Sequence, residues 1–133
     1  MAEFIPIHNF VIQEEGGYQD MAADSGNYVD GDLIGTNYGI SAPVLKSYLG
    51  RTPTKEEMQN LSFDDSVIIY IKNYWNKIYG DDIDNDSVAK LIYDGSVNQG
   101  RGAMRTIVGT CLRTLGVSIS DNNVFTKAGI KEL

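Results

Sequence analysis

The sequence has little of two things that several classes of protein need, which are cysteine and long apolar runs. Its single cysteine, Cys111, is not enough for an internal disulfide framework or a cysteine-rich zinc site. No apolar run approaches the roughly 20 residues that cross a bilayer. We therefore expect neither disulfide cross-links nor a membrane span.

Positive charge is also scarce, and a targeting segment is not visible. The chain has 11 Lys and Arg residues against 18 Asp and Glu residues, which gives a formal net charge of -7. Nucleic acids and anionic membranes both bind basic surfaces, so we expect neither as a partner. The segment MAEFIPIHNF has no basic flank and no small-residue cleavage site, so we expect no signal peptide.

The sequence is rich in helix signals. Its 133 residues, 42% of them hydrophobic, suit one domain with a packed core. Apolar residues at helical spacing, with capping residues before them and glycines after them, predict an all-α, mainly helical fold. The expected helices cover residues 4 to about 14 and 41 to 50, then begin at 54, 62, 86 or 87, about 103 and about 126. The sequence ends inside the last expected helix, which fits a chain that is truncated at its C-terminus.

Two of these helices carry an apolar stripe that we expect to face the core. In the long helix after Ser62, the stripe is Phe63, Val67, Tyr70, Ile71, Tyr74 and Ile78. In the helix after QGRG, it is Ala103, Ile107, Cys111, Leu112 and Leu115. The second stripe would bury the Cys111 thiol as an unreactive core group.

Residues 14–41, EEGGYQDMAADSGNYVDGDLIGTNYGIS, break the helical pattern. Gly16 and Gly17 end the first helix, and the segment then lacks any helical or strand periodicity of useful length. The letters DGD at 30–32 predict a turn, so we expect a long loop or a small hairpin. Long irregular segments in compact domains are often functional.

Two carboxylates in this segment suggest acid–base chemistry. Glu15 stands at the C-terminal end of the first predicted helix, where the helix dipole and apolar shielding would both raise the pKa of a carboxyl group. Such a group is a general acid at neutral pH. Asp24 follows nine residues later across a flexible connection, so it can face Glu15 as a carboxylate that either directs water or attacks the sugar. The Thr36 hydroxyl can help to hold that water. Glycoside hydrolysis requires such a pair of carboxyl groups.

The order of three motifs resembles a known family of enzymes. E-G-G-Y, then D-x-G, then T-N-Y-G-I-S is similar to the opening of glycoside hydrolase family 108, the N-acetylmuramidase-type domains of phage endolysins and of proteins once named secretion activators. YWNKIYGDDI and LIYDGSVNQGRGAMR resemble later helices of that family, in which Asp94 and Asn98 hold matching positions. SDNNVFTKAGI is similar to the start of the peptidoglycan-binding-like tail that often follows.

The resemblance implies a lysozyme-like muramidase that cleaves the β-1,4 bond between N-acetylmuramic acid and N-acetylglucosamine. Glu15 would be the general acid, while Asp24 and Thr36 would direct water in an inverting reaction. The residues expected to contact the glycan are Tyr18, Asn37, Tyr38, Asp94 and Asn98. No metal or other cofactor is required.

The same resemblance suggests how the chain is organised and where it acts. Residues 1–133 would be one lysozyme-like domain, with a catalytic part over 1–85 and a peptidoglycan-binding-like part over 86–133. Its partner would be the glycan strands of peptidoglycan, and we expect a monomer. A bacterial or phage protein of this kind would stay in the cytoplasm until release, or would be exported to act on the cell wall.

The sequence departs from the family pattern at three places. Glu14 stands where His is usual, Tyr38 stands where Trp is usual, and NYVDGDLI lengthens the link before Thr36. This insertion makes Asp30 and Asp32 rival second carboxylates. Two other functions therefore stay open. One is a peptidoglycan-binding or secretion-regulating module without catalysis, and the other is a lytic transglycosylase, which needs the acid but no second carboxylate.

Overall fold

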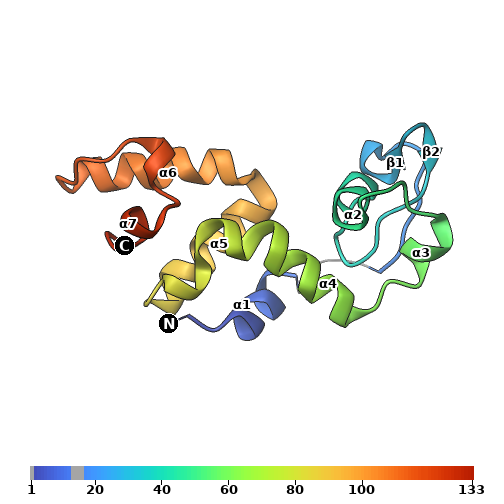
Figure 1. Ribbon diagram of the computed structural model, residues 1–133, viewed down its shortest axis with the longest axis horizontal. Helices are drawn as coiled ribbons and strands as arrows, with labels where there is room; N and C mark the ends of the chain where they lie inside the picture. The colour runs from blue at the N-terminus through green and yellow to red at the C-terminus, as the bar shows by residue number, and fades with distance from the viewer. Residues whose placement is uncertain (1, 13–16) are drawn as a thin grey trace. The chain divides into compact units, whose positions relative to one another are not determined.

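The computed structural model describes residues 2–12 and 17–133, and most of its regular elements are helices (Figure 1). These are α1 (Phe4–Val11), α2 (Ala42–Leu49), α3 (Lys55–Gln59), α4 (Phe63–Tyr70), α5 (Asp86–Gln99), α6 (Arg101–Thr114) and α7 (Lys127–Ile130). Two short strands, β1 (Tyr28–Val29) and β2 (Asp32–Leu33), pair as an antiparallel hairpin. The prediction of a mainly helical, lysozyme-like fold is confirmed. Within the described residues, no helix has the length and apolar character required to cross a bilayer.

The chain divides into two compact units. We call Ile12–Ile69 the central unit, and Met1–Val11 together with Tyr70–Leu133 the terminal unit. The central unit contains the hairpin, α2, α3 and most of α4, while the terminal unit contains α1, α5, α6 and α7. The functional division expected between residues 85 and 86 stays a prediction.

The hairpin forms where the sequence predicts a turn. Asp30 and Gly31 join the two strands with φ values of 53° and 83°. Two successive positive φ values are typical of the type I′ turn, whose twist matches that of a two-stranded ribbon, and Asp-Gly is one of its preferred pairs. The DGD turn at 30–32 is thus confirmed.

Helix α2 begins and ends at the residues that the sequence signals predict, and helix α3 begins where its capping box predicts. Gly50 ends α2 in the left-handed conformation, with a φ of 75°. Thr54 and Glu57 form a reciprocal capping box at the start of α3, with bonds of 3.0 and 3.1 Å. These helices contribute Leu45 and Met58 to the core of the central unit, each at most 2% exposed.

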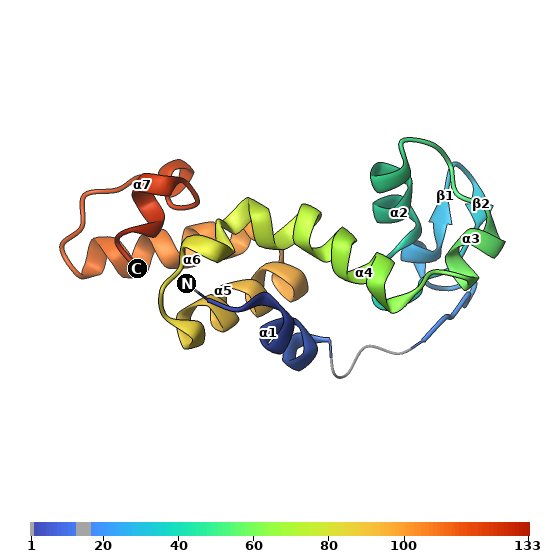
Figure 2. The same cartoon turned by 60° about the horizontal axis from the view of Figure 1, so that its bottom comes forward.

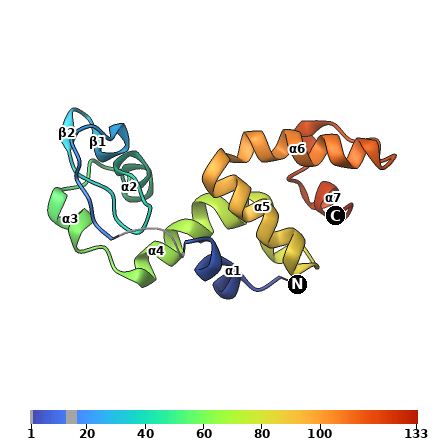
Figure 3. The ribbon, with the colours of Figure 1, turned by 180° about the vertical axis from the view of Figure 1, so that it is seen from behind.

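The terminal unit is built around aromatic rings between α1 and α5, which lie side by side (Figures 2 and 3). The rings in contact are Phe4, His8, Tyr70, Trp75 and Tyr93. Trp75 ends a π-helical turn that continues from α4, so the long helix expected after Ser62 does form, with a local change of winding. The indole lies so close to Gly80 that a Cβ there would be 2.2 Å from the ring.

The prediction that the apolar stripe of α6 faces the core is wrong for all of its residues except Leu112. The buried positions of α6 are Met104, Val108, Gly109 and Leu112. Ala103, Ile107, Cys111 and Leu115 all lie on the exposed side, and Leu115 is 80% exposed. The Cys111 thiol is therefore at the surface and not in the core.

The reason for this shift lies in glycines on the packed faces. Gly95 of α5 leaves the space that the Met104 side chain fills, because a Cβ at Gly95 would lie 2.2 Å from the methionine sulfur. Gly109 of α6 similarly leaves room for the side chains of Asp121 and Val124. Both sides of α6 are partly apolar, so helical spacing alone did not distinguish the side that meets these partners.

His8 makes the terminal unit sensitive to acid. Its side chain is 0% exposed, and its Nδ1 lies 2.8 Å from the Tyr93 hydroxyl, with which it forms a hydrogen bond. Burial lowers the pKa of His8 from 6.5 to about 4, because a charged imidazole would lose its hydration. Between these two values the unfolded chain binds more protons than the folded chain, so stability falls as the pH falls.

We expect the free energy of unfolding to decrease by about 3 kcal/mol from this group as the pH falls from about 6.5 to below about 4. Urea unfolding of wild type and His8→Gln over this pH range measures the effect. Glutamine retains a polar partner for Tyr93 but does not titrate, so its stability curve should be flatter. Equal slopes for the two proteins would show that His8 is not the titrating group.

Candidate active site

Asp24 accepts hydrogen bonds on both of its carboxylate oxygens. Oδ1 accepts from the backbone N–H of Gly26 at 2.9 Å, and Oδ2 accepts from the Gln19 side-chain amide at 2.9 Å. The first bond is the local turn that aspartate commonly makes with its own backbone. The second bond comes from outside this turn and holds the other oxygen. An ionised carboxylate, which can only accept, suits both bonds.

Gln19 and Asn27, which the sequence analysis did not single out, connect Asp24 to Thr36. The Asn27 side chain is 0% exposed, and its Nδ2 donates to Gln19 Oε1 at 2.7 Å. Its Oδ1 accepts from the Thr36 hydroxyl at 2.6 Å. The proposed water-directing residues therefore belong to one hydrogen-bonded network. The sequence carries no clear signal for it, because Gln19 and Asn27 belong to no motif.

The insertion before Thr36 is closed at its base. The backbone carbonyl of Asn27 accepts from the N–H groups of Ile34 and Gly35 at 2.8 and 3.0 Å. The chain therefore returns to its starting point before Thr36, which pairs with Gln19 through two backbone bonds of 2.8 and 2.9 Å. The added residues form a separate hairpin and leave Thr36 beside Gln19.

The rival carboxylates lie on this hairpin, away from the network. Asp30 forms an ion pair with Lys46 at 2.8 Å and accepts a hydrogen bond from the Thr52 hydroxyl. The hydrogen bond from Lys46 is the largest effect that lowers the pKa of Asp30, followed by the bond from Thr52. Asp32 is an exposed strand residue opposite Val29. This geometry favours Asp24 as the second carboxylate.

The Tyr18 side chain packs against the same loop. Its hydroxyl donates to the Ile34 carbonyl at 2.9 Å, and its ring lies against Gly35. A Cβ at Gly35 would be 2.5 Å from the ring, and the φ of 102° also favours glycine there. Desolvation by burial is the main cause that raises the pKa of Tyr18. The ring is half-buried, so part of it stays accessible to a ligand.

Asn37 and Tyr38 occupy a second tight turn, and they differ in accessibility. Asn37 is 5% exposed, and its amide donates to the Met58 carbonyl at 2.9 Å, so it ties the loop to α3. Tyr38 is half-buried, with its ring packed edge-on against Phe63 at 6.2 Å between centroids. Its φ of 52° is unusual for a bulky residue and costs on the order of 1–3 kcal/mol. Such strain clusters at functional sites.

Asp94 and Asn98 lie on α5 in the terminal unit. Asn98 Nδ2 donates to the Asp94 carboxylate at 2.6 Å and to its backbone carbonyl at 3.0 Å. The two side chains are therefore paired along one face of the helix. Asn98 is exposed and Asp94 is half-buried, so both can meet a ligand. Glu15, the predicted general acid, and its neighbour Glu14 lie outside the described residues.

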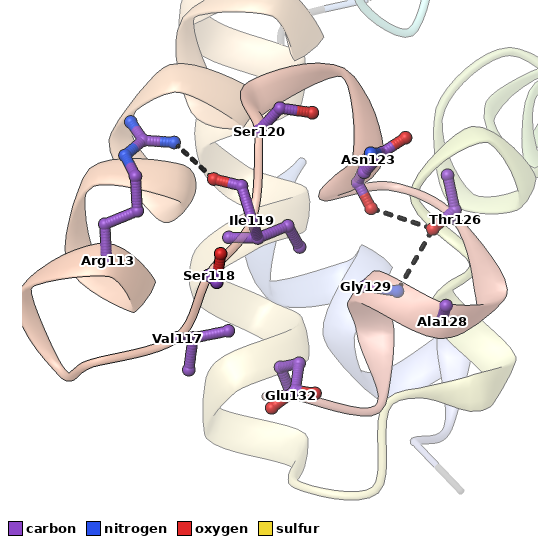
Figure 4. Close-up of a pocket in the computed structure, with 10 residues that line it drawn as sticks. All are labelled: Arg113, Val117, Ser118, Ile119, Ser120, Asn123, Thr126, Ala128, Gly129 and Glu132. Carbon is purple, nitrogen blue, oxygen red and sulfur yellow. Dashed lines mark hydrogen bonds between the residues drawn. The ribbon is translucent and has the colours of Figure 1, made fainter.

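The terminal unit also has an open groove of about 590 Å³ near the end of the chain (Figure 4). The walls are formed by Arg113 on α6, the segment Val117–Ser120, and residues in and around α7. Arg113 is already engaged, since it pairs with Asp121 at 2.8 Å and donates to the Ile119 carbonyl. Glu132 adds an opposite charge, so the lining does not select ligands of one charge.

The fold of the chain is mainly helical and lysozyme-like. The helical chain carries a small hairpin next to an aspartate and a threonine joined in one polar network. Among solved structures, the chain resembles SagA of Brucella abortus with a TM-score of 0.69 and 28% sequence identity. That match covers 96% of this chain and 68% of SagA. No curated protein matches the sequence.

The model of the family described as glycosyl hydrolase 108 matches residues 8–100, which is more than half of the chain. The chain therefore belongs to glycosyl hydrolase family 108. It is a glycoside hydrolase of the lysozyme-like type that degrades peptidoglycan. The resemblance noted in the sequence is confirmed over this range, while the peptidoglycan-binding-like tail after residue 100 stays a prediction.

Proposed function

We propose that the protein is an N-acetylmuramidase that cleaves the β-1,4 bond between N-acetylmuramic acid and N-acetylglucosamine with inversion of configuration. The observation that carries this proposal is the network that joins Asp24 to Thr36 across a closed insertion. The network supports a water-directing role for these two residues.

In the proposed reaction, Glu15 protonates the glycosidic oxygen as the bond to the anomeric carbon breaks. A water molecule attacks that carbon from the opposite face and transfers a proton to Asp24. Thr36 accepts the second water proton in a hydrogen bond. The reaction produces one new reducing end and uses no cofactor.

Candidate glycan contacts are proposed within each unit by itself. Tyr38 offers a half-buried ring held in a strained backbone conformation, and Tyr18 offers the accessible part of a second ring. Sugar faces commonly lie on such aromatic surfaces because their C–H groups are apolar. Asp94 and Asn98 present a paired carboxylate and amide that suit sugar hydroxyl groups. Asn37 is 5% exposed, so its proposed contact with the glycan is limited to that small surface.

Analysis of the products from purified peptidoglycan tests this proposal. We expect reducing N-acetylmuramic acid ends, and proton NMR early in the reaction of a soluble glycan should show the α anomer first, as inversion of a β bond requires. A 1,6-anhydro sugar would identify a lytic transglycosylase instead. Binding of the sacculus without any new ends, at any pH between 4 and 8, would favour the non-catalytic module.

A further inference from the structure

The orientation of the Gln19 side chain is fixed by the backbone of Met21. Gln19 Oε1 accepts from the Met21 N–H at 3.0 Å. A backbone N–H can only donate, so the atom facing it must be the amide oxygen. The amide nitrogen then faces Asp24, to which it donates at 2.9 Å.

The orientation of Asn27 is fixed by the same residue. Asn27 Nδ2 donates to the Met21 carbonyl at 2.9 Å, and a carbonyl can only accept. The oxygen of Asn27 must therefore face Thr36, whose hydroxyl has to donate its proton to it at 2.6 Å. Because Asn27 is 0% exposed, bulk water does not compete for these bonds.

The result is a chain of hydrogen bonds with one direction. Thr36 donates to Asn27, Asn27 donates to Gln19, and Gln19 donates to Asp24. Aligned donors strengthen one another, and the Asp24 carboxyl group is the acceptor at the end of the chain. At the other end, the single Thr36 proton is committed to Asn27, so the hydroxyl offers only its lone pairs to a ligand.

We propose that Gln19 and Asn27 are positioning residues that make both Asp24 and Thr36 hydrogen-bond acceptors towards the attacking water. The inference rests on the proposed function and deepens it. The water would donate one hydrogen to Asp24 and one to Thr36, which leaves an oxygen lone pair for the anomeric carbon. On attack, the new C–O bond forms as the glycosidic bond breaks and one water proton passes to Asp24, while the leaving oxygen takes its proton from Glu15. The Thr36 proton stays on its own hydroxyl, hydrogen-bonded to Asn27.

Gln19→Glu is the sharpest test, because it places a second carboxyl group 2.9 Å from Asp24. Two carboxylates at that distance retain a shared proton to higher pH and titrate as a pair. We expect the acid limb of the kcat profile to move upward by at least about one pH unit, with KM changed less than about two-fold. Asp20, the charged residue next to Gln19 in the sequence, is held in an ion pair with Lys55, and wild type and variant share this pair.

Gln19→Met serves as a second variant that should fold. It removes the donor to Asp24, while Asn27 keeps its bond to the Met21 carbonyl and the Met21 N–H lies at an exposed position. We expect kcat to fall on the order of 10-fold to 100-fold, as misplacement of a catalytic group does, with the acid limb again moved upward. A merely structural role would lower Tm without moving that limb.

Asn122→Asp is the matched control. It makes the same change from amide to carboxylate at an exposed residue of the terminal unit, outside the family match. Its acid limb should coincide with that of wild type. A variant of Gln19 that folds with an unmoved acid limb would overturn the inference, provided that Asp24→Asn is inactive. If Asp24→Asn retained wild-type activity, the proposed function itself would fail.

Discussion

Glu15→Gln is expected to reduce hydrolysis of purified peptidoglycan to below a few per cent of the wild-type rate. Glutamine keeps the size of the side chain but has no acidic proton to give to the leaving oxygen, and general acid catalysis contributes roughly 100-fold to 10,000-fold. The position follows the apolar residues of α1 in the sequence and precedes Gly16 and Gly17. The rate of turbidity loss, together with the number of new reducing ends, measures the effect.

Glu14→Gln is the natural control, because it makes the same substitution one residue earlier. Its activity should stay within about two-fold of wild type, and thermal unfolding should show both variants folded. If Glu15→Gln cleared peptidoglycan while Glu14→Gln did not, the general acid would be Glu14.

The second large effect is expected at Asp24. Asp24→Asn should lower kcat by about 100-fold or more, because an amide cannot take the proton of the attacking water. The variant should fold, since asparagine can still accept from the Gly26 N–H and cap the turn Ser25–Asn27.

Asp30→Asn and Asp32→Asn provide two matched comparisons for that result. Asparagine tolerates the positive φ at Asp30, so the hairpin turn should be retained. Loss of the exposed ion pair with Lys46 should cost little stability, because water already screens these two charges. Both variants should keep kcat within a few-fold of wild type, and a larger loss at either position than at Asp24 would reassign the second carboxylate.

Short-range signals in the sequence predicted the elements that depend on neighbouring residues. Thr54 with Glu57 and Ser62 with Asp65 form the capping interactions that their spacing indicates. The Asp30–Gly31 turn is set by the conformational freedom of those two residues. Such features need only a few residues of sequence, so they were predicted correctly.

Features that depend on distant partners were not predictable in the same way. The buried face of α6 depends on the space at Gly95 of α5, which the Met104 side chain fills. The spacing of apolar residues within α6 carries no information about that space. The Gln19–Asn27 network requires knowledge that the insertion closes on itself. Asp24 and Thr36 were identified as candidates, but their connection became visible only in three dimensions, and the role of Glu15 stays a prediction.

The contact between α1 and α5 has a consequence for the order of folding. His8 and Tyr93 form a hydrogen bond across this contact and are 85 residues apart in the sequence. The whole central unit lies between them in the chain. At about 5–20 residues per second, a ribosome needs roughly 4 to 17 s to make that stretch. During this time Phe4 and Ile7 have no α5 to cover them. The nascent chain therefore carries an uncovered apolar segment for seconds, and α1 docks only after the central unit has been synthesised.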